Sequence, residues 1–332
     1  MHSRMEIAGV VAAVTFMTLV GAPQPPVAAR VNAFESGVGS KIAFTTDRDG
    51  RDASDEIYVM NADGTDEVRL TFTTSGNCIF PEWSPDGRTI AFHLNPTELG
   101  GRFEIFVVEA DGSGATRRLT DMSALGLSAL NATWSPDGKR IAFNSQDAAG
   151  NRDLWAINLD GTGLTRLTSD PANEANPDWS PDGRTIAFNS NRSGNPDIYL
   201  MSADGAHDAN DWVRLTFEPT GDISPDWSPN GRWIAFETLR DGNREIYVMS
   251  PDGTNQIRLT HDPRNDAFPS WAPDGRQVAF NRQVVSIAGF TPPNGSEIFA
   301  IDVNTLQETR LTARTPESFS AFASWAAGRA KE

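Results

Sequence analysis

A four-part sequence unit is repeated six times along most of this chain, and it limits the fold more than any other feature. The first marker is Trp-Ser-Pro-Asp-Gly or a close variant, with tryptophans 44 to 54 residues apart. The other markers are Ile-Ala-Phe, an acidic residue followed by apolar residues, and Arg-Leu-Thr. The six tryptophans, called the repeat tryptophans below, are Trp83, Trp134, Trp179, Trp227, Trp271 and Trp325. Markers that recur in the same order indicate a repeat architecture.

Each unit predicts four short antiparallel strands. The marker segments are rich in β-branched and aromatic residues, while Pro-Asp-Gly and Asp-Gly supply the turns between them. Units of this length with four strands are typical of propeller blades, and a single blade cannot cover both of its own faces. We therefore predict an all-β fold, a six-bladed β-propeller of four-stranded antiparallel blades over residues 41–328, followed by a tail at 329–332.

The two ends of the repeat predict how the ring closes. The first unit has the Ile42-Ala43-Phe44 segment but no tryptophan segment before it. The last tryptophan segment, Phe322 to Trp325, has no further unit after it. We expect this C-terminal strand to become the innermost strand of the first blade, because the ring then has no open edge.

Residues 1–29 have the layout of a secretory signal peptide. Arg4 precedes an uncharged run over 7–22, and Val27, Ala28 and Ala29 offer small residues for cleavage. The apolar run is shorter than the roughly 20 residues that span a bilayer, although a membrane anchor is the alternative interpretation. We expect cleavage, a short N-terminal segment at 30–40, no membrane insertion afterwards, and an exported protein that is periplasmic or secreted.

The combined pattern resembles the WD40-like (PD40) repeat of TolB-type β-propellers over about residues 40 to 326. It reads Pro-x-Trp-Ser-Pro-Asp-Gly, Ile-Ala-Phe, Ile-Tyr-Val-Met-x-Ala-Asp-Gly and Arg-Leu-Thr. The resemblance implies a binding module in the cell envelope, with a peptidoglycan-associated lipoprotein as a partner. TolB proteins carry an α/β domain before the propeller, and we expect this chain to lack that domain because only Arg30 to Ser40 precede the first blade.

Charge and motif content restrict the chemistry. The net charge is -16, which disfavours nucleic acid as a partner because phosphates would be repelled. The chain contains no Gly-x-Ser-x-Gly pentapeptide, and the three histidines outside the predicted signal peptide, His93, His207 and His261, occupy unrelated repeat positions. We therefore predict a monomeric protein that is not an enzyme and requires no cofactor.

The residue five before each repeat tryptophan is expected to begin the innermost strand, near the mouth of the central channel. Three acidic residues occupy this position in neighbouring units, namely Glu174, Asp222 and Asp266, and Cys78 and Ser320 occupy it elsewhere. Converging carboxylates repel one another unless a cation separates them, so these three predict a Ca²⁺ site. The alternative for the acids is that they cap turns and face water. Cys78 is expected to be a buried, inert thiol, and a nucleophile is the alternative for it. The alternative function is a propeller enzyme, a hydrolase, lactonase or lyase that uses a cation at the channel mouth.

Apolar residues in the loops indicate a surface for a protein partner. Loops between second and third strands share one face with the connections between blades, and exposed apolar loops on one face are typical of binding surfaces. The alternative is that these loops fold over each other and plug the channel. The candidates are Leu94, Leu99, Leu125, Leu127, Val284, Val285, Ile287 and Phe290.

Overall fold

The computed structural model describes residues 40–48, 54–205, 209–283, 295–312 and 319–326. The predicted signal peptide, all but the last residue of the segment at 30–40, and the predicted tail lie outside the described residues. These assignments therefore stay predictions.

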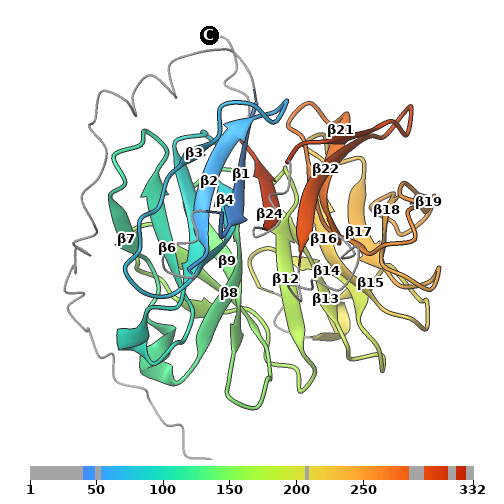
Figure 1. The fold of residues 1–332 in the computed structure, drawn as a ribbon. Coiled ribbons are helices and arrows are strands. Elements are labelled where there is room, and N and C mark those ends of the chain that lie inside the picture. Colours follow the sequence, from blue (N-terminus) through green and yellow to red (C-terminus); the bar gives the residue numbers. More distant parts are fainter. Residues whose placement is uncertain (1–39, 49–53, 206–208, 284–294, 313–318, 327–332) are drawn as a thin grey trace, which may run out of the picture.

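Six four-stranded antiparallel sheets surround a central axis as the blades of a β-propeller (Figure 1). The predicted fold class is thus confirmed. In the first blade the order from the axis outward is β24 (Ser320–Trp325), β1 (Lys41–Thr46), β2 (Glu56–Asn61) and β3 (Val68–Arg69). The second blade contains β4 (Cys78–Trp83), β5 (Thr89–Leu94), β6 (Glu104–Glu109) and β7 (Thr116–Arg118). The third contains β8 (Ser128–Trp134), β9 (Arg140–Gln146), β10 (Leu154–Asn158) and β11 (Thr165–Arg166).

The other three blades follow the same order. The fourth contains β12 (Glu174–Trp179), β13 (Thr185–Ser190), β14 (Asp197–Ser202) and β15 (Val213–Arg214). The fifth contains β16 (Asp222–Trp227), β17 (Ile234–Thr238), β18 (Glu245–Met249) and β19 (Ile257–Arg258). The sixth contains β20 (Asp266–Trp271), β21 (Gln277–Gln283), β22 (Ser296–Asp302) and β23 (Glu308–Arg310). Short 3₁₀ helices occur at η1 (Thr97–Leu99), η2 (Met122–Leu125) and η3 (Ala209–Asp211).

The C-terminal strand closes the ring, as predicted. Strand β24 pairs antiparallel with β1, with Trp325 opposite Ile42 and Ser320 opposite Thr46. The amide of Ala326 donates to the carbonyl of Lys41 at 2.7 Å. The red β24 and the blue β1 therefore lie side by side, although they come from opposite ends of the chain (Figure 1).

The repeat markers build local structure. In Trp-Ser-Pro-Asp-Gly, the Ser84 hydroxyl donates to Asp86 Oδ1 at 2.7 Å, and the Gly87 amide donates to the Ser84 carbonyl at 2.9 Å. Gly87 takes a φ of 66°, a left-handed conformation that costs glycine little. In Arg-Leu-Thr, Arg69 Nη2 and Thr71 Oγ1 donate to the two carboxylate oxygens of Glu56, at 2.8 and 2.5 Å. The marker residues thus form the turns and clamp the two outer strands together.

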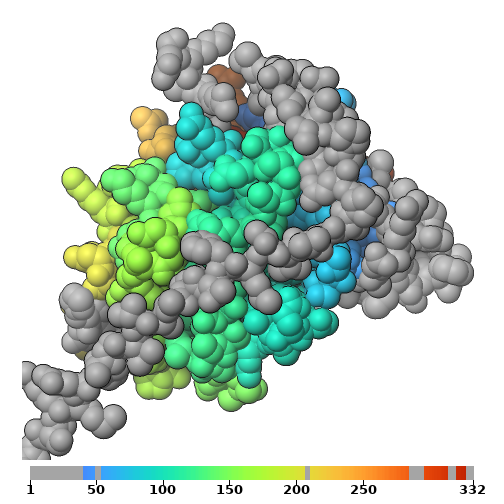
Figure 2. Space-filling model, turned by 90° about the vertical axis from the view of Figure 1, so that its left-hand side faces the viewer, coloured from blue at the N-terminus to red at the C-terminus, as the bar shows by residue number. Residues whose placement is uncertain are grey.

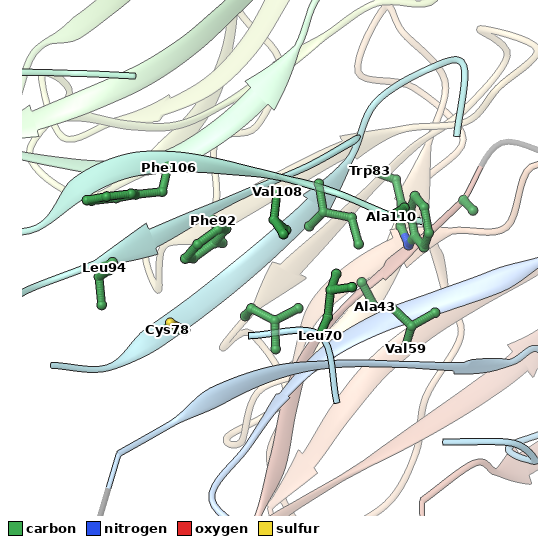
Figure 3. Close-up of a cluster of buried hydrophobic side chains, with 13 residues drawn as sticks. Ala43, Val59, Leu70, Cys78, Trp83, Phe92, Leu94, Phe106, Val108 and Ala110 are labelled. Atoms are coloured by element: carbon green, nitrogen blue, oxygen red, sulfur yellow. The ribbon is translucent and has the colours of Figure 1, made fainter. Parts of the chain in front are cut away.

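Each blade packs its two faces against its two neighbours. Figure 3 shows the seam between the first two blades, where Ala43, Val59 and Leu70 face Trp83 and Phe92. Six phenylalanines at the centres of the second strands have no exposed surface: Phe44, Phe92, Phe143, Phe188, Phe236 and Phe280. Figure 2 shows the side of the ring where the second and third blades, cyan to green, lie next to each other. Burial of both faces explains why the second strands are nearly continuous apolar runs rather than alternating ones.

Candidate functional site: the central channel

A cavity of about 120 Å³ lies on the axis of the ring, between the innermost strands of all six blades. Its wall consists of the three residues that precede each repeat tryptophan, or two of them. The cavity is therefore built from symmetric positions, and its chemistry depends on how the residues at those positions differ between blades.

The third residue before each repeat tryptophan has an unusual backbone. All six of these residues have positive φ, between 52° and 56°, although none is a glycine. Each lies where the pairing of the innermost strand with the second strand shifts register, which is a β-bulge. We call them the bulge residues: Phe80, Asn131, Asn176, Ser224, Phe268 and Phe322. Because a bulge re-aims a side chain, the same local irregularity brings all six to the wall of the cavity.

Three of the six bulge residues are aromatic. Phe80 stacks on Phe322 with ring centroids 3.6 Å apart. Phe268 meets both rings edge-on, at 5.5 Å from Phe80 and 5.0 Å from Phe322. Aromatic pairs of this kind contribute about 0.5–1.5 kcal/mol each beyond the area that they bury. These three residues form an aromatic wall on the second, sixth and first blades.

The other three bulge residues are polar. Asn131 donates its side-chain amide to Asn176. Asn176 in turn donates to Ser224 Oγ at 3.3 Å and to Asn189 Oδ1 at 2.8 Å. The channel therefore has an aromatic wall and, facing it, a hydrogen-bonded polar wall.

Three carboxylates lie directly before repeat tryptophans. Asp178 accepts hydrogen bonds from Thr133 Oγ1 at 3.0 Å and from the Trp227 amide at 2.6 Å. Asp226 accepts one from the Trp271 amide at 2.7 Å. The third carboxylate, Glu82, belongs to the second blade and lines the cavity together with Asp226. Asp178 and Asp226 thus connect the fourth blade to the fifth and the fifth to the sixth.

Burial raises the pKa of all three carboxyl groups, although only Glu82 and Asp226 line the cavity. It raises the pKa of Glu82 to about 8, and the nearby charge of Asp178 adds to the effect. It also raises the pKa of Asp178 to about 6. The pKa of Asp226 lies well above its ordinary value because of burial and, next, the charges of Asp178 and Glu82. The residues that line the cavity include no lysine, arginine or histidine that would offset these charges.

We expect Glu82→Gln to flatten the dependence of stability on pH. The folded state holds the Glu82 proton up to about pH 8, whereas the unfolded chain releases it near the ordinary value of 4.5. Between these values the folded state binds more protons, so the free energy of unfolding falls as pH rises, by up to about 1.4 kcal/mol per pH unit. Glutamine does not ionise. In Glu82→Gln the free energy of unfolding should therefore decrease less steeply as the pH rises.

Urea denaturation of both proteins across this pH window measures the effect. Glu109→Gln is the matched control, because Glu109 is exposed on β6. If the free energy of unfolding depends on pH equally in the wild type and in Glu82→Gln, the raised pKa of Glu82 is wrong.

The three acids predicted at the channel mouth lie elsewhere. Glu174, Asp222 and Asp266 have no exposed surface, and none lines the cavity. Each contacts a residue on or just after the second strand of its own blade. The Ser190 hydroxyl donates to Glu174 at 2.9 Å, Arg240 Nη2 donates to Asp222 at 3.2 Å, and Arg282 donates to both oxygens of Asp266 at 2.7 Å.

These acids also face the preceding blade rather than one another. Asp153 is among the charges that raise the pKa of Glu174 to about 8, a shift caused mainly by burial. Glu245 does the same for Asp266, whose pKa is raised to about 6, again mainly by burial. In the described part of the chain, no group of three or more His, Cys, Asp or Glu side chains is arranged to hold a metal ion. The Ca²⁺ prediction thus gains no support from this geometry.

Cys78 and Ser320 share this buried position in the second and first blades. Cys78 has no exposed surface, and burial, followed by the charge of Glu56, raises the pKa of its thiol well above its ordinary value. It lies in the seam between blades (Figure 3). Ser320 is 6% exposed and accepts a hydrogen bond from Arg48 at 3.3 Å.

The loop candidates for a partner surface divide into three groups. Leu125 is 58% exposed, and Leu99 and Leu127 are half-buried. Leu94 is only 1% exposed, because it is the last residue of β5 and packs in the core, so it does not belong to a surface. The remaining candidates, Val284, Val285, Ile287 and Phe290, lie outside the described residues.

Family comparisons support the fold. The sequence profile of the PD40 family, described as the TolB beta propeller domain, matches residues 31–147, 123–220 and 213–325. The chain belongs to the TolB β-propeller family. One relative is the Tol-Pal system protein TolB of Anaeromyxobacter dehalogenans (strain 2CP-C), which is 38% identical over 155 residues. That match covers 45% of this chain and 29% of the relative. The chain thus matches less than a third of the length of this TolB protein.

Solved structures of TolB and of other propellers resemble the chain. TolB from Acinetobacter baumannii has a TM-score of 0.70 at 21% identity, over 86% of this chain and 66% of that one. Oligogalacturonate lyase from Vibrio parahaemolyticus has a TM-score of 0.54 at 16% identity, over 83% of this chain and 75% of that one. At these identities the similarity shows the fold alone. The described part of this TolB-family chain has no helix long and apolar enough to cross a membrane.

Proposed function

We propose that the protein is an exported TolB-type propeller that binds a protein partner in the cell envelope and catalyses no reaction. The observation that carries this proposal is the family match, which extends from residue 31 to residue 325. A named relative belongs to the Tol-Pal system, so a peptidoglycan-associated lipoprotein is the first partner to test.

An apolar surface supports the proposal. Connections from a fourth strand to the next blade, and loops from a second to a third strand, lie on one face because neighbouring strands run antiparallel. On this face, which we call the loop face, Phe217 is 69%, Leu125 58% and Leu239 40% exposed. The Phe217 ring lies under the guanidinium of Arg214, 4.6 Å from its centroid. Aromatic residues and arginine are enriched in protein interfaces, so the pair of Phe217 and Arg214 is the strongest candidate for a contact with the partner.

Binding to the purified peptidoglycan-associated lipoprotein of the source bacterium tests the proposal. We expect a Kd in the micromolar range or tighter for the mature protein, measured by calorimetry. Phe217→Ser and Leu125→Ser should each weaken binding by about tenfold or more, as truncation of a central interface residue does. Leu164→Ser is the matched control, because Leu164 is 40% exposed in a loop between third and fourth strands, on the opposite face.

Two results would contradict this proposal. One is the absence of binding to this lipoprotein and, in a pull-down, to any protein of the envelope extract. The other is equal capture by the wild type, the loop-face variants and Leu164→Ser, because the loop face would then have no part in binding.

The alternative, an enzyme with a cation held by Glu174, Asp222 and Asp266, is less well supported. Each of these side chains is buried in a different blade seam, away from the cavity. Within the described residues, they do not form a site that a substrate would reach.

A further inference from the structure

The channel cavity combines two features that call for the same kind of ligand. Glu82 and Asp226 bring two carboxyl groups to the wall of the cavity. Phe80, Phe268 and Phe322 present aromatic rings to the same cavity. The carboxylates favour a cation, and aromatic faces attract organic cations.

The residues that line the cavity include no lysine, arginine or histidine, so no positively charged side chain among them balances the carboxyl groups. His93 lies behind the wall, with its ring 5.4 Å from that of Phe80 and its Nε2 accepting a hydrogen bond from the Ala132 amide at 3.2 Å. Burial lowers the pKa of His93 to about 3, so this side chain is neutral at neutral pH and does not balance the carboxylates.

The size of the cavity and the two kinds of residue in its wall fit a short chain that ends in one positive charge. A volume of about 120 Å³ is several times what one water molecule needs, so the cavity has room for a small organic group. Glu82 follows Phe80 by two positions in the same strand, so a carboxyl group and an aromatic ring are close together in the wall. A linear alkylammonium of four carbons offers a charge for the one and an apolar chain for the other.

We propose that the central channel binds an alkylammonium group, with its charge between Glu82 and Asp226 and its carbon chain against Phe80, Phe268 and Phe322. The aromatic wall favours this ligand over a divalent metal ion, which prefers an all-oxygen shell. The described residues also contain no group of three or more metal-ligating side chains arranged for a metal ion. This site is independent of the proposed partner surface on the loop face.

Calorimetric titration of the mature protein with n-butylammonium chloride near pH 7 tests the proposal. We expect saturable binding, and no binding of the isosteric neutral alcohol n-butanol. Because the ammonium charge replaces carboxyl protons in the cavity, binding should release protons, seen as an enthalpy that changes with the ionisation enthalpy of the buffer. This readout requires no variant.

Variants then locate the site. Glu82→Gln and, separately, Asp226→Asn should each weaken butylammonium binding by at least about tenfold, because each removes a charge that the ligand contacts without water between them. Glu109→Gln, an exposed change of the same kind, should leave the affinity unchanged. Circular dichroism of each variant confirms folding before titration.

The ammonium group could come from the lysine of a partner protein or from a free amine. Nα-acetyl-lysine N-methylamide, which carries the same ammonium on a peptide backbone, distinguishes these two sources. Affinity equal to that of butylammonium indicates the lysine of a partner protein, and much weaker affinity indicates a free amine. Three results would overturn the proposal: no saturable binding of butylammonium, equal binding of n-butanol, or unchanged affinity in both channel variants. Saturable calcium binding that excludes butylammonium would also overturn it.

Discussion

Deletion of residue 319 and everything after it should abolish cooperative folding of the propeller. The deletion removes β24, which supplies the innermost strand of the first blade. It also removes Trp325, which is 7% exposed in the core, and Phe322 of the aromatic wall. The free energy lost is comparable to the whole stability of a domain, about 5–15 kcal/mol, and β1 is left with an open edge that invites aggregation.

Thermal unfolding and size-exclusion chromatography measure this outcome. A chain that ends at Ala326 is the matched control, because it retains all of β24, and it should keep a single sharp transition. A peptide with the sequence of residues 319–326, added in excess, should partly restore folding by completing the sheet. An unchanged melting temperature in the shorter chain would contradict closure of the ring by β24.

Truncation of a central phenylalanine should have the second-largest effect. Phe236 lies in the middle of β17, has no exposed surface and packs with Ile198, Leu215 and Met249. Phe236→Ala removes these contacts and leaves a cavity, at an expected loss of about 3–5 kcal/mol in the free energy of unfolding. Such a loss is a large fraction of the stability of a typical domain.

Phe217→Ala is the matched control for this change. Phe217 is 69% exposed, so its truncation should alter the free energy of unfolding by no more than about 0.5 kcal/mol. Urea denaturation compares both variants with the wild type. Equal losses in the two variants would show that the second strands do not carry the core.

The architecture could be predicted from the sequence because each repeat marker forms a particular turn or strand contact. Ser84, Asp86 and Gly87 form a turn that their spacing alone specifies. The arginine and threonine of Arg-Leu-Thr bind the acid at the start of the third strand, as Arg69 and Thr71 do with Glu56. Six repetitions of such local signals determine the number of blades, and the incomplete first unit predicts how the ring closes.

The residues that line the channel could not be predicted in the same way, because of the bulge in each innermost strand. In a regular strand, Cys78 and Glu82 would share a face, since their positions differ by an even number. The bulge places Cys78 opposite Leu94 but Glu82 opposite Ala91, three residues apart, so the two side chains project from opposite faces. The residue five before each tryptophan therefore enters a seam, whereas the residue directly before it lines the cavity in three blades, at Glu82, Asp226 and Ser270.

No residue type signalled these bulges. Glycine is the usual indication of a left-handed backbone, but phenylalanine, asparagine and serine take that conformation here. The signal that was available is the residue directly before each repeat tryptophan, which is acidic in three of six units: Glu82, Asp178 and Asp226. On the loop face, Phe217 was likewise missed because it directly follows an Arg-Leu-Thr marker that was assigned only a structural role.

Closure of the first blade by β24 also sets the order of events in biosynthesis. Of the described strands, β24 is the last to leave the ribosome, whereas its partner β1 is the first. The ring therefore stays open until translation of β24 is complete, and the first blade waits for its fourth strand throughout synthesis. Until that strand is made, the inner edge of β1 has no partner in the chain and is the place where a premature contact with another chain would form.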